Sequence, residues 1–439
     1  MGGGGLLALL TLATSGLFKM AAFGREAFIA SHFGLSSFTD AYFAFQQFPL
    51  MLMTFMFGAF GLAFTPAYAA EKRSGGKVGW APGLLLYGTL LGFLLTLMTS
   101  LLAPWLLRAF TSAPSAHGAA TLVILGYAFA PIIWLGIWAG ITLANGRNVW
   151  AMFVTGLPYL LMTLLLVGLY ALGKLDDLSL PLSFLAGFSV IGIYGLVDLL
   201  VKEWGSADPA GILATWRLPN FRRFLRHLTA SSIENLGFSA NQLLLVFFLA
   251  KSGEGAVSAN NCAMRIGMLG FSLLGLPLAQ LVQAKLCAAT EQAQSELFKK
   301  WMTAVAGAVI AFAVVLYLGR EPISGLVYLR GKFSGVQLNR VVEITPAWIA
   351  YFVVSSLNAI MARYLFAMAQ GAVYVRRQLC AYLAANLMRA ALWGQLSAPM
   401  IVWCSVVAEG LALLINLRDC WRPTASEALE PEFVGAQEI

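Results

Sequence analysis

The chain consists largely of apolar stretches that are each long enough to cross a lipid bilayer. A transmembrane helix needs about 20 mainly apolar residues. Of the 439 residues, 59% are hydrophobic and only 11% are charged, whereas soluble domains have about 25% charged residues. The sequence therefore predicts an all-α polytopic membrane protein with about twelve transmembrane helices. The predicted spans are Leu6–Phe33, Asp40–Ala69, Ala81–Leu107, Ala119–Ala144, Val149–Leu172, Leu180–Val201, Ala230–Ala250, Ala256–Leu286, Trp301–Leu318, Ile344–Gln370, Gln378–Leu396 and Pro399–Leu417.

Lysine and arginine are concentrated in the loops on one side of these spans. Because cytoplasmic loops of membrane proteins are enriched in these residues, we expect both termini to be cytoplasmic. The same bias, together with attraction to anionic membrane lipids, largely explains the net charge of +8. We therefore infer no nucleic-acid partner from the charge.

The longest polar interruption lies near the middle of the chain and contains the stretch WRLPNFRRFLRHL. Basic and apolar residues alternate in it, as in segments that lie on the inner membrane face, and a linker between two halves fits equally well. A weak internal repeat pairs Thr39 with Ser258 and Gln46 with Arg265. We expect two pseudo-symmetric lobes around a central cavity. The predicted units are a six-helix lobe (1–204), a basic cytoplasmic interfacial linker (205–229), a second six-helix lobe (230–418) and a cytoplasmic tail (419–439).

Four cationic residues, Lys19, Arg25, Arg265 and Arg363, lie inside predicted spans. An ionisable group at membrane depth is costly unless it pairs, reaches the interface or faces water. Guanidinium and ammonium groups in a partly dry cavity suit a phosphate or diphosphate, because charge-assisted hydrogen bonds offset the desolvation. The pattern favours an anionic substrate. The alternative is internal pairing, for example of Lys19 with Glu26.

Acidic residues within or beside the spans are candidates for gating or ion coupling. They are Glu26, Asp40, Glu234 and Glu409. Protonation of such a group can couple transport to a proton gradient, and coupling to sodium or to the membrane potential stays open. Asp40 has a second interpretation, because the stretch SSFTDAY suits a helix N-cap.

No motif for nucleotide hydrolysis, for zinc chemistry or for a serine nucleophile occurs in the sequence, and its three histidines and five cysteines form no ligand pattern. We therefore expect no catalytic residues, no metal site and no cofactor. Gly24 lies beside the charges of the first span. We expect it to interrupt that helix, since broken helices lining a cavity are common in transporters.

The stretch from Phe23 to Pro66 resembles the opening of the MviN/MurJ family of lipid-linked oligosaccharide flippases. This family belongs to the multidrug/oligosaccharidyl-lipid/polysaccharide (MOP) exporter superfamily. Gly331-Lys332-Phe333 is a second match. The resemblance implies that Lys19, Arg25 and Arg265 stand at cavity cations of the family. It also places Asp40 at the acid that begins the second span.

The chain departs from the family in several ways. Met53 stands where lipid II flippases tend to have an arginine and Phe57 where they have an acid. The family has another arginine near the position of Met368, and Arg363 is the nearest cation to it in this sequence. Two further C-terminal spans of typical lipid II flippases have no counterpart among the predicted spans. The resemblance implies a bacterial inner-membrane transporter, not an enzyme, for undecaprenyl-pyrophosphate-linked glycans. The departures favour a precursor of an exopolysaccharide or other surface polysaccharide.

Four alternatives stay open at this stage. They are a lipid II flippase for peptidoglycan synthesis, a cation-coupled multidrug exporter of the same superfamily, a membrane glycan polymerase or ligase, and a silent scaffold. For the favoured flippase we expect alternating access, with a lipid-linked oligosaccharide and membrane lipids as partners. Proteins of glycan synthesis and export are further candidate partners.

Overall fold

The computed structural model describes residues 18–421, apart from residues 19, 74–77, 79, 112–115, 146, 205–214, 216–217, 288–290 and 369. Within this part every regular element is helical, which confirms the predicted all-α class. A helix over residues 20–33 comes first. It is followed by α2 (Ser37–Phe55), η1 (Met56–Phe60), α3 (Gly61–Arg73), α4 (Ala81–Leu101), α5 (Ala103–Phe110), α6 (Ala116–Gly126), α7 (Phe129–Ala144), α8 (Asn148–Ala171), α9 (Ser179–Leu199) and η2 (Leu200–Trp204). The elements labelled η are π-helices.

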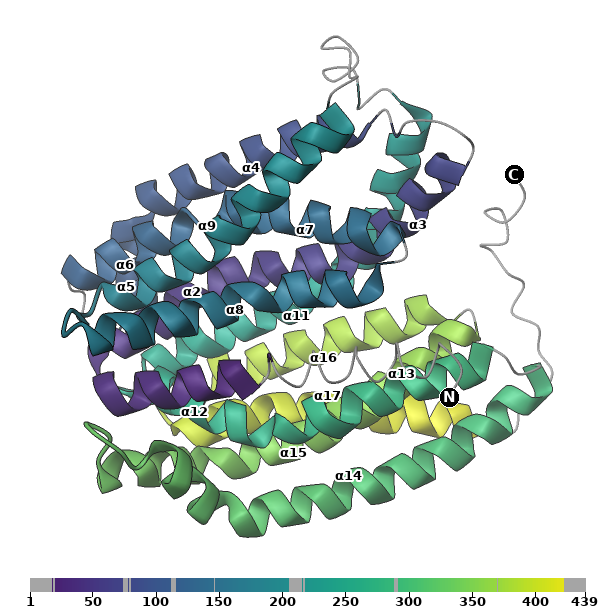
Figure 1. The fold of residues 1–439 in the computed structure, drawn as a ribbon. Helices are drawn as coiled ribbons and strands as arrows, with labels where there is room; N and C mark the ends of the chain where they lie inside the picture. The colour runs from purple at the N-terminus through teal and green to yellow at the C-terminus, as the bar shows by residue number, and fades with distance from the viewer. Residues whose placement is uncertain are drawn as a thin grey trace, which may run out of the picture.

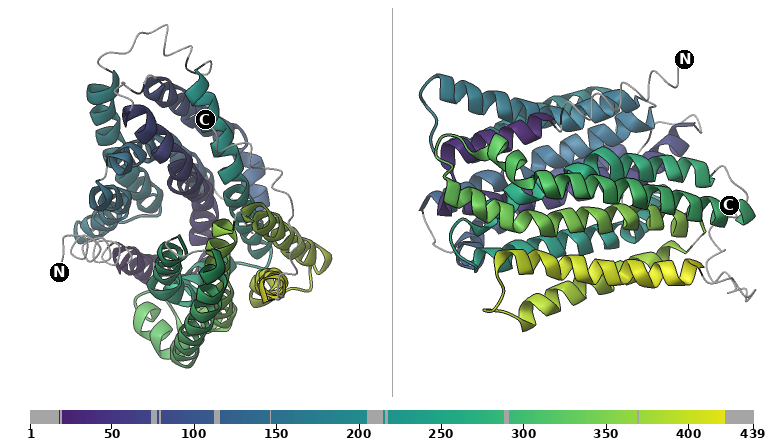
Figure 2. Two further views of the ribbon diagram at one scale, coloured as in Figure 1. Left: turned by 90° about the vertical axis from the view of Figure 1, so that its right-hand side faces the viewer. Right: turned by 90° about the horizontal axis from the view of Figure 1, so that it is seen from below.

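The second half of the chain repeats this pattern of long helices. It contains α11 (Pro219–Ala250), α12 (Ala256–Gly267), η4 (Phe271–Gly275), α13 (Leu276–Cys287), α14 (Glu291–Tyr328), α15 (Gly335–Ala367), α16 (Gly371–Ala391) and α17 (Ala398–Trp421). Figure 1 shows α4 to α9 packed in one lobe and α13 to α17 in the other, with all long axes running in a similar direction. Seen along those axes, the two groups of helices lie on opposite sides of the molecule (Figure 2).

The spans predicted from the sequence correspond to these helices. Nine helices of the described residues are long and apolar enough to cross a membrane, and the bent pair of α12 with η4 and α13 makes ten. The first predicted span is represented by the helix over residues 20–33. The eleventh lies within α16, whose sequence is more polar than that of the other spans.

The helix containing Gly24 is not interrupted. Residues 20–33 form one continuous helix, so the predicted break at Gly24 is wrong. A glycine lacks a side chain but keeps its backbone donor, so a single one is tolerated inside a helix at a cost of about 1 kcal/mol. Among the helices that line the space between the lobes, α2 continues into the π-helix η1, and α12 is followed by η4 and α13. The pair of α12 with η4 and α13 bends by 40°.

The helix α11 joins the two lobes. Residues 219–229, which the sequence assigns to the linker, form its first turns. There, Phe224 stacks on Trp80 and meets the rings of Phe60 and Phe64 in the first lobe. Further along, α11 packs against α16 of the second lobe. One continuous helix therefore connects the two bodies.

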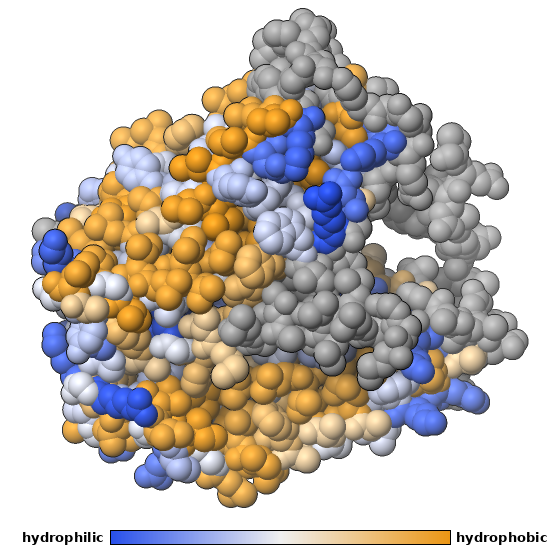
Figure 3. Space-filling view, in the orientation of Figure 1, coloured by the Kyte–Doolittle hydropathy of each residue, from blue (hydrophilic) through white to orange (hydrophobic). Residues whose placement is uncertain are grey.

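Apolar side chains cover the broad side of both lobes, and hydrophilic ones gather toward the two ends of the helices (Figure 3). Many of the exposed residues are large and hydrophobic, such as Leu97, Trp105 and Leu318. Soluble proteins rarely expose continuous apolar areas of this kind. The surface is that of a protein surrounded by lipid, as the sequence predicts.

Candidate functional site

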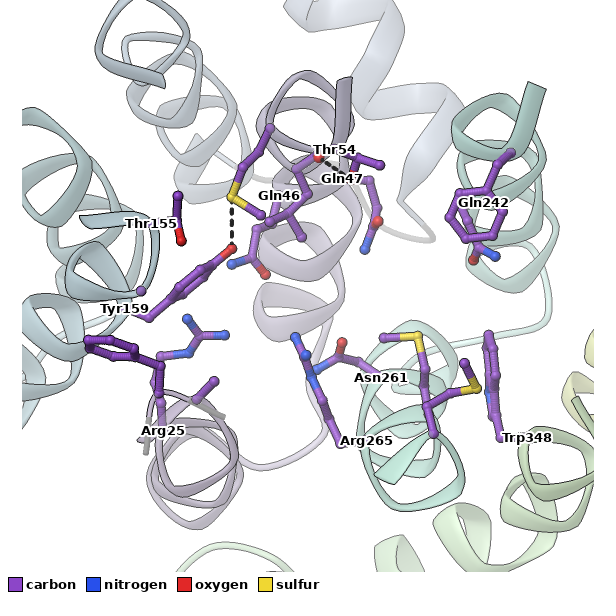
Figure 4. Close-up of a pocket in the computed structure, with 18 of the residues that line it drawn as sticks. Arg25, Gln46, Gln47, Thr54, Thr155, Tyr159, Gln242, Asn261, Arg265 and Trp348 are labelled. Atoms are coloured by element: carbon purple, nitrogen blue, oxygen red, sulfur yellow. Dashed lines mark hydrogen bonds between the residues drawn. The ribbon is translucent and has the colours of Figure 1, made fainter. Parts of the chain in front are cut away.

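A cavity of about 450 Å³ lies between the lobes. This volume is within the range of about 300–1,000 Å³ that is usual for ligand sites. The first lobe contributes lining residues from the helix over 20–33, from α2 and from α8, and the second lobe contributes residues from α11, α12 and α15 (Figure 4). The polar and charged lining residues are Arg25, Gln46, Gln47, Thr54, Thr155, Tyr159, Gln242, Asn261, Arg265, Trp348 and Tyr351.

Arg25 and Arg265 meet in this cavity through one shared carboxylate. Glu26 forms ion pairs with Arg25 and, at 3.2 Å, with Arg265. The side chain of Asn261 donates a further hydrogen bond of 3.0 Å to the same carboxylate. Two guanidinium groups from opposite lobes thus share a single acid. The cluster keeps a net positive charge, which suits an anionic ligand.

Both arginines retain free hydrogen-bonding capacity. Arg25 is only 1% exposed, and its other contacts are a weak bond of 3.4 Å to the Met162 sulfur and the ring of Tyr159, whose centre is 5.2 Å away. The Nε atoms of Arg25 and Arg265 have no hydrogen-bond partner. A buried donor without a partner costs about 1–3 kcal/mol. The cluster therefore favours a ligand that supplies oxygen acceptors.

The remaining predicted site residues lie away from this cluster. Lys19 is outside the described residues. Arg363 on α15 and Glu234 on α11 are half-buried and do not line the cavity. Glu409 on α17 is 4% exposed and accepts a hydrogen bond of 2.7 Å from Tyr351, whose ring lines the cavity. Glu409 thus contacts the cavity only through another side chain.

Asp40 lies at the end of the bundle where α2 and α12 begin, which we term the closed end. The N-cap of α2 is Ser36, in a capping box with Thr39, so Asp40 does not cap its own helix. Its carboxylate instead accepts hydrogen bonds from the backbone N–H groups of Gly255 (2.6 Å) and Ser258 (2.8 Å). These are free amides at the start of α12, which has no side-chain cap of its own. Asp40 of one lobe therefore caps a helix of the other.

A second carboxylate makes the reverse connection. Glu254, just before α12, accepts a hydrogen bond of 2.9 Å from the backbone N–H of Ser37 at the start of α2. Each lobe thus places an acid at a helix N-terminus of its partner, where the helix dipole stabilises negative charge. The side chains of Thr39 and Ser258, paired in the weak internal repeat, also meet at 2.9 Å. These contacts join the lobes at the closed end.

The turn before α15 adds a further contact at the closed end. The backbone N–H of Lys332 donates a hydrogen bond of 2.7 Å to the Ser31 carbonyl. Gly331 has φ +62, and a Cβ atom at this position would lie 2.2 Å from the same carbonyl oxygen. Only glycine combines this backbone conformation with such a close approach. The Gly-Lys-Phe motif singled out in the sequence therefore lies against the first lobe.

Two functional candidates were missed by the sequence reasoning. Glu254 is a loop residue whose role depends on a helix distant in sequence. Gln46 is a neutral residue, but it is 2% exposed and its Nε2 atom has no partner beside the cavity. The internal repeat, which aligns Gln46 with Arg265, was the one feature of the sequence that could have identified Gln46.

The fold defines the class of protein. It matches a solved lipid II flippase MurJ in an inward closed conformation with a TM-score of 0.82 and 16% identity, over 94% of this chain and 87% of that one. It also matches an inward-facing multidrug resistance MATE family transporter of the MOP superfamily with a TM-score of 0.73 and 16% identity, over 94% and 98% of the two chains. At such identities the likeness concerns the fold alone. The chain therefore has the two-lobe fold of MOP transporters.

The sequence comparison is more specific. The family model described as lipid II flippase MurJ matches residues 29–417. A lipid II flippase MurJ of Burkholderia cenocepacia is 26% identical over 352 residues. This match spans 74% of the chain and 66% of the Burkholderia protein, just under two thirds of its length. The chain belongs to the MurJ family.

Proposed function

We propose that this protein is a flippase that moves an undecaprenyl-pyrophosphate-linked glycan precursor across the bacterial cytoplasmic membrane. The observation that carries the proposal is the pair of guanidinium groups, Arg25 and Arg265, which come from two lobes and share one carboxylate in a cavity of about 450 Å³. A diphosphate offers the acceptors that their free Nε atoms lack. The polyprenyl tail stays in the lipid during transfer.

Alternating access accounts for the arrangement of the lobes. The capping contacts of Asp40 and Glu254 hold the lobes together at the closed end, which we assign to the outer side. The diphosphate enters between the arginines from the cytoplasm. A ligand shifts a conformational equilibrium only if it binds the two states differently. By replacing Glu26 as the partner of both arginines, the diphosphate changes the contacts between the lobes.

The test is export of the glycan in cells that depend on this gene. Arg25→Ala and Arg265→Ala are each expected to abolish export, because each removes half of the proposed diphosphate site. Membrane insertion, followed by a fluorescent tag and size-exclusion chromatography, is expected to stay normal. Full export by both variants would remove the site assignment.

A lipid II flippase is the second candidate function. It is favoured by the description of the matching family and of the Burkholderia relative. The departures at Met53 and Phe57 favour an exopolysaccharide or other surface polysaccharide precursor. Complementation of a strain depleted of its lipid II flippase separates the two. Growth indicates lipid II, and failure with normal insertion indicates another glycan.

A cation-coupled drug exporter is a weaker candidate. Such a protein needs an acid that faces the cavity, whereas the charged residues among the described lining are Arg25 and Arg265. Glu234→Gln and Glu409→Gln measure the contribution of two acids of the second lobe that lie within its helices. Loss of drug resistance in these variants supports an exporter. Loss of glycan export supports ion coupling of the flippase.

A further inference from the structure

We propose that the amides of Gln46, Gln47 and Gln242 bind the hydroxyl groups of an uncharged sugar that is attached to the diphosphate. We call these three residues the amide wall. The inference rests on the proposed function and names the part of the substrate that this function leaves open. In Figure 4 the side chains of Gln46 and Gln47 point from α2 into the space that Arg25 and Arg265 enter from the opposite side.

Gln46 provides the main observation. Its side chain is 2% exposed, it lines the cavity, and its Nε2 atom has no hydrogen-bond partner. Buried polar groups are nearly always hydrogen-bonded, and an exception needs an explanation. A ligand in the cavity supplies one, because a hydroxyl group accepts from the amide nitrogen. The Nε2 atom of Gln46 is therefore a donor that a ligand in the cavity can use.

The other two amides extend this surface. Gln47 donates a bond of 3.4 Å to the Phe43 carbonyl of its own helix, which leaves its Oε1 atom free to accept. Gln242 on α11 belongs to the second lobe and forms no hydrogen bond with other described residues. Each amide offers both donors and an acceptor. Hydroxyl groups also donate and accept, so sugars match this surface.

The charges of the lining limit the kind of sugar. Arg25 and Arg265 are its charged members among the described residues, and neither lies on the amide wall. A carboxylate or ammonium group placed against neutral amides loses its hydration without gaining an opposite charge. A peptide-bearing head group carries such charges, and a neutral sugar does not. The amide wall therefore selects for an uncharged sugar next to the diphosphate.

The test measures binding to the purified full-length protein in nanodiscs. The probes are farnesyl diphosphate and the same molecule carrying one glucose. We expect the glucose to improve the dissociation constant about tenfold in the wild type, which corresponds to about 1.4 kcal/mol. In Gln46→Leu the gain is expected to fall to about twofold. No gain in the wild type, or an undiminished gain in Gln46→Leu, overturns the inference.

Gln378→Leu is the matched control. Gln378 is 1% exposed and its Nε2 atom also lacks a partner, but it lies on α16 and does not line the cavity. This variant is expected to keep the tenfold gain. If it loses the gain as Gln46→Leu does, the effect is general destabilisation and the amide wall is not the cause. If Gln46→Leu fails to fold, the same measurement is made with Gln242→Leu, whose substitution is at a half-buried position.

A third probe tests the selection against charge. Farnesyl diphosphate carrying a muramyl peptide is expected to bind no better than farnesyl diphosphate alone. Tighter binding of this probe contradicts the uncharged sugar and supports lipid II. If the wild type binds no farnesyl diphosphate at all, the proposed function fails. If it binds the diphosphate and gains nothing from glucose, only the amide wall fails.

Discussion

Among the residues that the structure describes, two arginines are fully buried, and their surroundings are very different. Arg389, in the last turn of α16, donates to the Ile401 carbonyl (3.0 Å), to Asn241 (2.9 Å), to Asn386 (2.7 Å) and to Ser405. All these acceptors are neutral, and all belong to the second lobe. Its guanidinium is therefore held inside one rigid body.

Arg25 is buried to a similar degree but differs in each of these respects. Its main partner is an acid, Glu26, that also binds Arg265 of the other lobe. Its Nε atom has no partner, and its side chain lines the cavity. Burial alone therefore does not identify a functional charge. An arginine saturated within its own lobe stabilises the fold, whereas an unsaturated one between lobes is available for a ligand.

The largest expected effect is on stability, at Arg389. Arg389→Leu leaves the acceptors of Asn386 and Ser405 without this donor. Asn241 keeps only the bond of 3.2 Å from the side chain of Asn386. At about 1–3 kcal/mol for each unsatisfied group, we expect the free energy of unfolding to fall by about 3 kcal/mol or more. Thermal unfolding of the detergent-solubilised protein measures this. Arg389→Lys keeps the charge but has fewer donors. Its free energy of unfolding is expected to lie between those of the wild type and Arg389→Leu.

Arg25→Gln is expected to lower the transport rate and to leave the stability nearly unchanged. Loss of a charged group that contacts the diphosphate lowers the transport rate about 100-fold, which corresponds to about 2.7 kcal/mol. The melting temperature changes little, because Arg265 and Asn261 still bind Glu26. Transport into proteoliposomes and thermal unfolding of the same sample measure both. A large loss of stability in Arg25→Gln with a normal rate would erase the distinction between the two arginines.

Asp40→Asn extends the comparison to the closed end. An amide keeps one acceptor oxygen but cannot accept on its nitrogen. One of the two backbone N–H groups of α12 therefore loses its partner, and we expect the closed end to be less stable by about 1–2 kcal/mol. Labelling of Ser37→Cys, in the presence and absence of Asp40→Asn, reports opening of the closed end, because Ser37 contributes its backbone N–H and not its side chain to the contacts there. Equal labelling in both proteins contradicts the capping role.

The smallest expected effect is at Tyr351. Tyr351→Phe removes the hydrogen bond of 2.7 Å to Glu409 but keeps the ring that lines the cavity. We expect a loss of stability of about 1 kcal/mol and a transport rate within about threefold of the wild type. Thermal unfolding and transport are measured as before. A transport loss as large as that of Arg25→Gln places Glu409 and Tyr351 in the transport cycle.

The sequence contains enough information for the helical class, the two lobes and the pair Arg25 and Arg265. Long apolar runs are a strong signal, and a charge inside one of them is costly enough to require either pairing or a polar cavity. The saturation of Arg389 could not be predicted, because its partners Asn241 and Ser405 lie on other helices. The partners of Asp40 could not be predicted, because its contacts with Gly255 and Ser258 connect segments that are distant in sequence. Gln46 was missed because it carries no charge.

The central claim is that guanidinium groups from both lobes bind one diphosphate. The most direct test compares the affinities of the purified protein for farnesyl diphosphate and farnesyl monophosphate. We expect the wild type to prefer the diphosphate at least tenfold, because a second phosphate reaches the second arginine, and we expect Arg265→Gln to bind the two ligands almost equally. The same preference in the wild type and in Arg265→Gln would contradict the account.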